Sequence, residues 1–128
     1  MNNKLLELAE WTIKTAKNAG ADDCRVSIEG ERFVEISYRE RKPENIKEAS
    51  TKSVYIEIFK NGKYSGQSTS DLRKEALSSF IYNAVKMTDL LAQDPYRSLP
   101  DKKYYEGLKN IDLEQYDEKI KNITPEER

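Results

Sequence analysis

The chain has 128 residues, of which 37% are hydrophobic and 35% are charged, and this length suits one domain with a buried core and a tail. Its 22 basic and 23 acidic residues are interleaved and leave a formal net charge of −1, so the basic excess with which nucleic-acid-binding proteins neutralise phosphates is missing. The sequence has no histidine, the commonest general base and metal ligand, and its single cysteine, Cys24, excludes an internal disulfide.

Residues 4–19 predict an amphipathic helix, because their apolar side chains recur at steps of three and four residues. The stripe consists of Leu5, Leu8, Ala9, Thr12, Ile13 and Ala16. Gly20 follows where a left-handed cap is expected at the end of a helix. Trp11 lies beside the stripe, and we interpret it as a packing residue rather than a binding residue.

Beyond this helix the apolar period changes to two, which is typical of half-buried strands. Residues 24–28 predict a first strand, residues 30–31 interrupt the pattern, and residues 34–38 predict a second strand. The polar segment 40–50 contains Pro43, and we expect a connection there with a short strand at its end.

Residues 54–59 predict a third strand, and residues 63–69 predict another extended segment. Asn61-Gly62 lies between them, and this pair is the strongest short signal for a hairpin because both turn residues need positive φ. Ser70 and Asp71 then offer N-cap side chains to a long second helix, whose apolar residues continue to Leu91.

Consecutive strands with short turns pair antiparallel, and both helices must bury their apolar stripes on one sheet. We therefore expect an α+β two-layer sandwich in the order helix, antiparallel β-meander of about four strands, long helix, and irregular C-terminal tail. The domain is expected to span residues 1–103.

The tail, residues 104–128, carries a helix-start pattern at its end. Thr124 fits an N-cap, Pro125 the first helical position and Glu127 the third, which together form a capping box. We interpret the tail as a connector that leads to a C-terminal domain missing from this sequence. The alternative is a chance match within a polar tail.

Several short segments, in this order, resemble those of the TldD/PmbA family, whose members are also described as modulators of DNA gyrase. The matching segments are Gly20-Ala21-Asp22 with Cys24-Arg25-Val26-Ser27, Glu44-Asn45-Ile46, Val54-Tyr55-Ile56, Asn61-Gly62-Lys63, Ser68-Thr69-Ser70-Asp71-Leu72, Asp94-Pro95-Tyr96, Leu99-Pro100-Asp101, and Asp112-Leu113 through Thr124-Pro125-Glu126-Glu127. The resemblance is closer to the PmbA branch, also called TldE, than to TldD. The chain departs from the family at residues 51–53, which lack the usual glycines, and at residues 64–67, which are not mainly apolar.

The resemblance implies a two-domain cytoplasmic protein that takes part in proteolysis of peptides or small proteins. In TldD-type subunits a His-Glu-x-x-x-His motif in the C-terminal domain binds zinc, and PmbA-type subunits resemble its non-metal partner. Because this chain has no histidine, no metal ligand can be transferred to it, and we expect no catalytic, cofactor-binding or metal-binding residue here. The expected partners are its own C-terminal domain, a partner subunit in a homo- or hetero-dimer, and a peptide substrate. We expect neither a nucleic acid nor a membrane as a partner.

Two roles stay open for the chain. The first is a non-catalytic scaffold in a metalloprotease-type assembly that holds an extended peptide against a strand edge, for which residues 63–69 are the candidate. The second is a freestanding protein-interaction or oligomerisation module. Its support is a set of aromatic residues suited to interfaces: Tyr38, Tyr55, Tyr64, Tyr82, Tyr96, Tyr104 and Tyr105.

Two further features have plain explanations. A basic cluster of Arg39, Arg41, Lys42 and Lys47 is diluted by neighbouring glutamates and predicts a solvated charged face rather than a nucleic-acid site. Cys24 has no histidine to activate it, and we interpret it as a small core residue.

Overall fold

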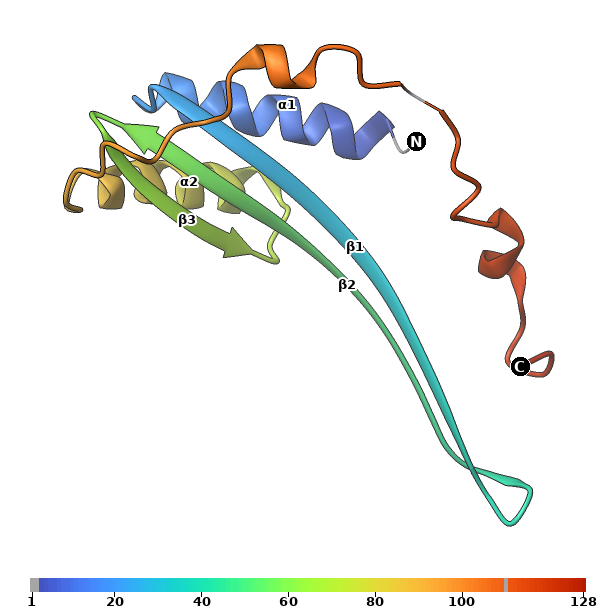
Figure 1. Cartoon of the computed structure of the whole chain (residues 1–128). Coiled ribbons are helices and arrows are strands. Elements are labelled where there is room, and N and C mark those ends of the chain that lie inside the picture. The colour runs from blue at the N-terminus through green and yellow to red at the C-terminus, as the bar shows by residue number, and fades with distance from the viewer. Residues whose placement is uncertain (1–2, 110) are drawn as a thin grey trace.

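The computed structural model of the chain describes residues 3–109 and 111–128 (Figure 1). In chain order, the elements are α1 (Asn3–Asn18), β1 (Asp23–Arg39), β2 (Lys42–Lys60), β3 (Lys63–Thr69), α2 (Lys74–Thr88) and two short 3-10 helices, η1 (Lys102–Tyr105) and η2 (Glu118–Asn122). The described strands form one antiparallel sheet in the order β1-β2-β3. The α+β class is therefore confirmed, with three strands where about four were predicted.

The core lies between one face of this sheet and the two helices. Val54, Ile56 and Ile58 alternate along the central strand, point to the helices and are fully buried. Burial of each such side chain contributes about 2 kcal/mol to folding. The core residues are Ala16, Ala21, Cys24, Val54, Ile56, Ile58, Leu77, Ile81, Ala84 and Val85. Both amphipathic helices thus cover the same face, as the sequence predicts.

The prediction of separate first and second strands was wrong. Residues 24–28 and 34–38 belong to one continuous strand, β1, and Gly30 pairs with Lys52 without leaving the ladder. The prediction of a connection at residues 40–50 was also wrong, because most of this segment belongs to β2. The hydrogen bonds between paired strands come from the main chain and need no apolar side chain. A strand whose side chains are polar on both faces therefore shows no alternation of apolar and polar residues in the sequence.

The turn between β1 and β2 is formed by Glu40 and Arg41, which have φ values of 50° and 64°. Positive φ at both residues matches the twist of a two-residue hairpin, but these residue types seldom adopt it. The register shifts next to this turn, where Tyr38 pairs with Pro43 and Ser37 pairs with Asn45. A strained turn and a local bulge therefore end the hairpin, and neither has a clear signature in the sequence.

The far half of this hairpin projects beyond the helices as a two-stranded ribbon (Figure 1). We call residues 29–39 together with residues 42–52 the ribbon. Every residue from 42 to 52 is exposed, whereas Val54 two positions later is fully buried. A lone pair of strands is marginally stable in water, so the ribbon is the least supported part of the sheet.

Other boundaries differ by a few residues. The Asn61-Gly62 turn is confirmed, with φ values of 51° and 71°.

The second helix begins at Lys74 rather than next to Ser70 or Asp71, and it ends at Thr88. The Asp71 carboxylate instead accepts a hydrogen bond from the Arg73 main chain at 3.1 Å. Hydrogen bonds from the Arg73 side chain and main chain lower the pKa of Asp71 to about 2.

The tail is irregular apart from the two 3-10 helices. Near its end, the Thr124 main-chain N–H donates to the Glu127 carboxylate at 2.9 Å, which is one half of a capping box. The tail also reaches the ribbon, because Arg32 Nη1 donates to the Lys121 carbonyl at 3.4 Å and Arg128 lies 3.6 Å from Glu48. No described helix is long and apolar enough to cross a membrane.

A double substitution tests the strain in the ribbon turn. Glu40→Asn with Arg41→Gly places residues there that tolerate positive φ, and we expect amide exchange in residues 44–51 to slow by about fivefold. Exchange at the buried positions of β2 should not change. The matched control, Asn61→Glu with Gly62→Arg, should speed exchange in β3 instead. Unchanged ribbon exchange would show that the turn is not the weak point.

Candidate functional site

The sheet has two free edges, and the shorter one is β3. The strand predicted as the candidate for peptide addition, residues 63–69, lies at this edge, which confirms its placement. Ser65 anchors β3 to the helix layer, because its hydroxyl lies 2.7 Å from the Thr88 hydroxyl in the core. Thr88 also donates to the Ala84 carbonyl at 2.8 Å, so this buried polar pair is satisfied. The contact between Ser65 and Thr88 therefore holds the helix-facing side of β3 against α2.

The face of the sheet opposite the helices carries a polar cluster centred on Glu57. Its carboxylate accepts a hydrogen bond from the Tyr64 hydroxyl at 2.9 Å and another from Arg25 Nε. Glu57 is only 8% exposed although it lies on this face. Burial alone would raise the pKa of the Glu57 carboxyl, but the hydrogen bonds from Arg25 and Tyr64 and the Arg25 charge outweigh it and lower the pKa.

Tyr64 and Tyr55 complete this cluster over Gly66. A Cβ at Gly66 would lie 2.3 Å from the Tyr55 hydroxyl and 3.1 Å from the Tyr64 hydroxyl, so only glycine leaves room for both rings here. Hydrogen bonding to Tyr55, burial and the bond to Glu57 raise the pKa of Tyr64. The Tyr64 hydroxyl therefore stays protonated, and the two tyrosine hydroxyls lie together as hydrogen-bonding groups on this face of the sheet.

Residues 93–97, which follow α2, cross the end of this face near the β2–β3 turn. The Asp94 main-chain N–H donates to the Gly62 carbonyl at 2.8 Å, and Gln93 Nε2 donates to the Asn61 carbonyl at 3.1 Å. These bonds place the Arg97 guanidinium 4.5 Å from the centre of the Tyr64 ring, within cation–π range. The segment thereby brings a second arginine to the Glu57 cluster.

A small cavity of about 120 Å³ lies between the cluster and this segment. Arg25 and Arg97 both line it, and their side chains are 54% and 56% exposed. Arg25 is paired with Glu57 and Arg97 lies 3.7 Å from the Asp94 carboxylate, so the charges balance, but both guanidinium groups keep exposed N–H donors. Such a place suits the carboxylate or carbonyl groups of an extended polypeptide.

The remaining residues weighed from the sequence lie away from this cluster. Cys24 is buried in the core, where burial raises the pKa of its thiol, so it is a poor nucleophile. The residues of the basic cluster lie at the end of the ribbon, where Arg39 lies 3.4 Å from the Glu44 carboxylate. Sequence reasoning missed Glu57 and Arg97, because a charged residue within a strand and one in an irregular segment carry no pattern of their own.

A divalent metal needs three or four ligands within reach of one another. The sequence contains no histidine. Residues 3–109 and 111–128 bring together no group of three or more aspartate, glutamate or cysteine side chains that could hold a metal ion. The described residues therefore do not form a zinc site of the kind that the resemblance implies for the C-terminal domain of TldD-type subunits, and no chemical step through a metal follows from them.

The chain as a whole is similar to known proteins. A family model described as PmbA/TldA metallopeptidase domain 1 matches residues 24–88. The crystal structure of a candidate modulator of DNA gyrase from Bacteroides thetaiotaomicron is 26% identical, with a TM-score of 0.89 over 98% of this chain and 28% of that one. TldE from Thermococcus kodakarensis is 20% identical, with a TM-score of 0.64 over 73% of this chain and 21% of that one, and shows the fold alone. No curated protein matches the chain.

The depressed pKa of Glu57 predicts a pH-dependent contribution to stability. Glu57→Gln weakens the bonds to Arg25 and Tyr64, and we expect a loss of about 1 kcal/mol in the free energy of unfolding at neutral pH. The native carboxylate contributes stability above its ordinary pKa of 4.5, and this contribution disappears as the pH falls through the lower folded value.

Urea unfolding at neutral pH and again well below pH 4.5 measures this difference. The curves of Glu57→Gln and the native chain should converge at the acidic pH. Glu31→Gln, an exposed carboxylate on the same face, is the matched control and should change neither curve. A difference that persists at low pH would contradict the assignment of the stabilising charge to Glu57.

Proposed function

Because the chain belongs to the PmbA/TldD metallopeptidase family, as its first domain, we propose that it is a non-catalytic scaffold of a cytoplasmic metalloprotease-type assembly that acts on peptides or small proteins. The chain spans 28% and 21% of the two solved relatives, so the chemistry belongs to the rest of the parent protein or to its partner. We further propose residues 1–103 as the domain and residues 104–128 as the connector. The parent is either a zinc-binding subunit or, as the closer resemblance to PmbA favours, its non-metal partner.

The observation that carries this proposal is the free β3 edge beside Arg25 and Arg97. An extended peptide can add to a sheet edge through main-chain hydrogen bonds, which are independent of its side chains. The exposed guanidinium groups supply N–H donors for a peptide carboxylate or carbonyl, and the hydroxyls of Tyr55 and Tyr64 supply further hydrogen-bonding groups. This arrangement can hold an unfolded substrate but contains no group set to cleave it.

Peptide binding is tested by titrating the isotope-labelled chain with an unstructured acidic peptide and recording amide shifts. We expect changes in residues 63–69 and in the 93–97 segment, and Arg97→Ala should weaken binding about threefold. Arg73→Ala removes a more exposed arginine, one that lies away from the cluster, and should have no effect. Shift changes confined to other parts of the chain would reject β3 as the binding edge.

Cleavage is tested separately with a quenched fluorescent peptide and added zinc. We expect no cleavage by the 128-residue chain, because its described residues provide neither a metal site nor an activated nucleophile. Cleavage that a chelator abolishes would contradict the scaffold proposal, whatever the peptide titration shows.

A further inference from the structure

The outer edge of β1, the longer free edge of the sheet, has no neighbouring strand along the ribbon. Among the described residues β1 pairs with β2 alone, and no main-chain hydrogen bond from elsewhere reaches residues 29–39. The unpaired N–H and C=O groups of such an edge can accept an added strand. A peptide bound in this way gains affinity from its main chain, and the surroundings of its alternate side chains give specificity.

The two faces of β1 differ in chemistry along the ribbon. Val34 lies on the helix side, because it continues the alternation of Val26, which packs against the core. Along the ribbon β1 contributes no acidic side chain to this face. The opposite face carries three exposed carboxylates of β1: Glu29, Glu31 and Glu35. None of them forms an ion pair among the described residues, and the nearby Lys47 lies over the Phe33 ring, 5.9 Å from its centre.

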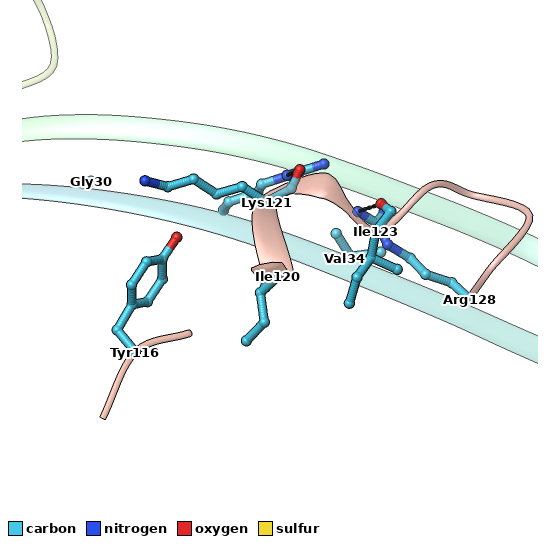
Figure 2. Close-up of a pocket in the computed structure, with 8 residues that line it drawn as sticks. Gly30, Val34, Tyr116, Ile120, Lys121, Ile123 and Arg128 are labelled. Atoms are coloured by element: carbon cyan, nitrogen blue, oxygen red, sulfur yellow. Dashed lines mark hydrogen bonds between the residues drawn. The ribbon is translucent and has the colours of Figure 1, made fainter. Parts of the chain in front are cut away.

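A pocket lies beside this edge on the helix side, between β1 and the tail. Its volume is about 480 Å³, and Gly30, Arg32 and Val34 form its wall on β1. Figure 2 shows Tyr116 and Ile120 of the tail on the side of β1 that faces away from β2. These two side chains are 56% and 55% exposed, so the described residues leave an apolar surface uncovered next to the strand edge.

Charged groups hold the tail in place around the pocket. Arg32 Nε donates to the Glu48 carboxylate at 2.8 Å, and Arg128 lies 3.6 Å from the same carboxylate. Lys121 lies 2.7 Å from the Glu118 carboxylate. Three cationic side chains thus meet two carboxylate side chains here. A basic side chain is therefore unfavourable in the pocket, whereas a large apolar one fits beside Tyr116 and Ile120.

We propose that the ribbon edge of β1 binds an extended segment of the substrate polypeptide in which apolar and basic residues alternate. One large apolar side chain enters the pocket beside Gly30, where the missing side chain leaves room for it. The basic side chains point to the opposite face, next to the carboxylates of β1, where opposite charges stabilise neighbouring strands. This site rests on the scaffold function proposed for the chain, and adds to it a second edge that selects a peptide by its sequence.

Titration of the isotope-labelled full chain with the peptide Thr-Lys-Ser-Lys-Phe-Lys-Ser-Lys-Thr tests the binding. We expect saturable amide shifts in residues 29–39. Replacement of Phe by Ser leaves the pocket empty and should weaken binding about tenfold. Replacement of every Lys by Glu should weaken it by at least about tenfold. N-methylation of Phe and of the next Lys removes a donor from each edge of the peptide, and should also weaken binding about tenfold.

A substitution that fills the pocket tests where the Phe side chain lies. Gly30→Ile should be tolerated by the strand, because a Cβ at residue 30 meets only the Lys52 side chain, at 3.8 Å. We expect it to weaken binding of the Phe peptide about tenfold and to change binding of the Ser peptide little. Thr51→Ile adds the same side chain to the opposite face of β2 and is the matched control, which should leave both affinities unchanged.

A charge exchange tests the orientation of the peptide. Glu31→Lys combined with Glu35→Lys should weaken binding of the Lys peptide about tenfold and make the Glu peptide the tighter ligand. Glu7→Lys combined with Glu10→Lys makes the same change of net charge on α1, and should leave the preference for the Lys peptide intact.

Four results would each overturn the ribbon site: shifts confined to residues outside the ribbon, unchanged binding after N-methylation, unchanged binding to Gly30→Ile, or no change of preference after the charge exchange. The acidic peptide tests β3 separately. Its binding at residues 63–69 without any binding at residues 29–39 would reject the ribbon site and leave the scaffold proposal standing. Binding at the ribbon alone would support the ribbon site and reject β3 as a binding edge.

Discussion

The structure depends on the ladder between β1 and β2, and above all on the alternation of burial along β2. In β2, the side chains of residues 54, 56 and 58 are buried under the helices. This buried half of β2 fixes the register in which β1 and β2 pair. Because the ladder keeps one register as far as the pair Ser37–Asn45, the same register aligns most of the exposed half. One buried strand segment thereby positions the Glu57 cluster, the β3 edge and the ribbon.

The apolar patterns of the sequence predict what is buried and little of what is exposed. The two helices, the inward residues of β2 and the Asn61-Gly62 turn follow from periodicity and turn chemistry, because the hydrophobic effect and positive φ restrict the residues allowed there. The polar half of β2 cannot be predicted in this way. Ile46 is its one large apolar side chain, and main-chain pairing does not restrict which residue types occur there. Gly30 led to a wrong prediction of a strand end. The sequence alone does not distinguish a glycine that pairs within a strand from a glycine that ends a strand.

The candidate site was predictable only in part. The β3 strand follows from its hairpin turn, but its position at an edge requires the sheet order. Glu57 and Arg97 come together across forty residues, through a strand and an irregular segment that have no shared pattern. Their placement around one cavity depends on the hydrogen bonds that hold residues 93 and 94 against the β2–β3 turn. Such contacts arise only once the chain has folded.

The helices cover and stabilise one half of the sheet, while the ribbon extends beyond them. Residue-resolved amide exchange along β2 tests this difference most directly. We expect slow exchange at residues 54–58 and much faster exchange at residues 44–52. Uniform protection along β2 would contradict this expectation, because the ribbon would then be as stable as the half that the helices cover.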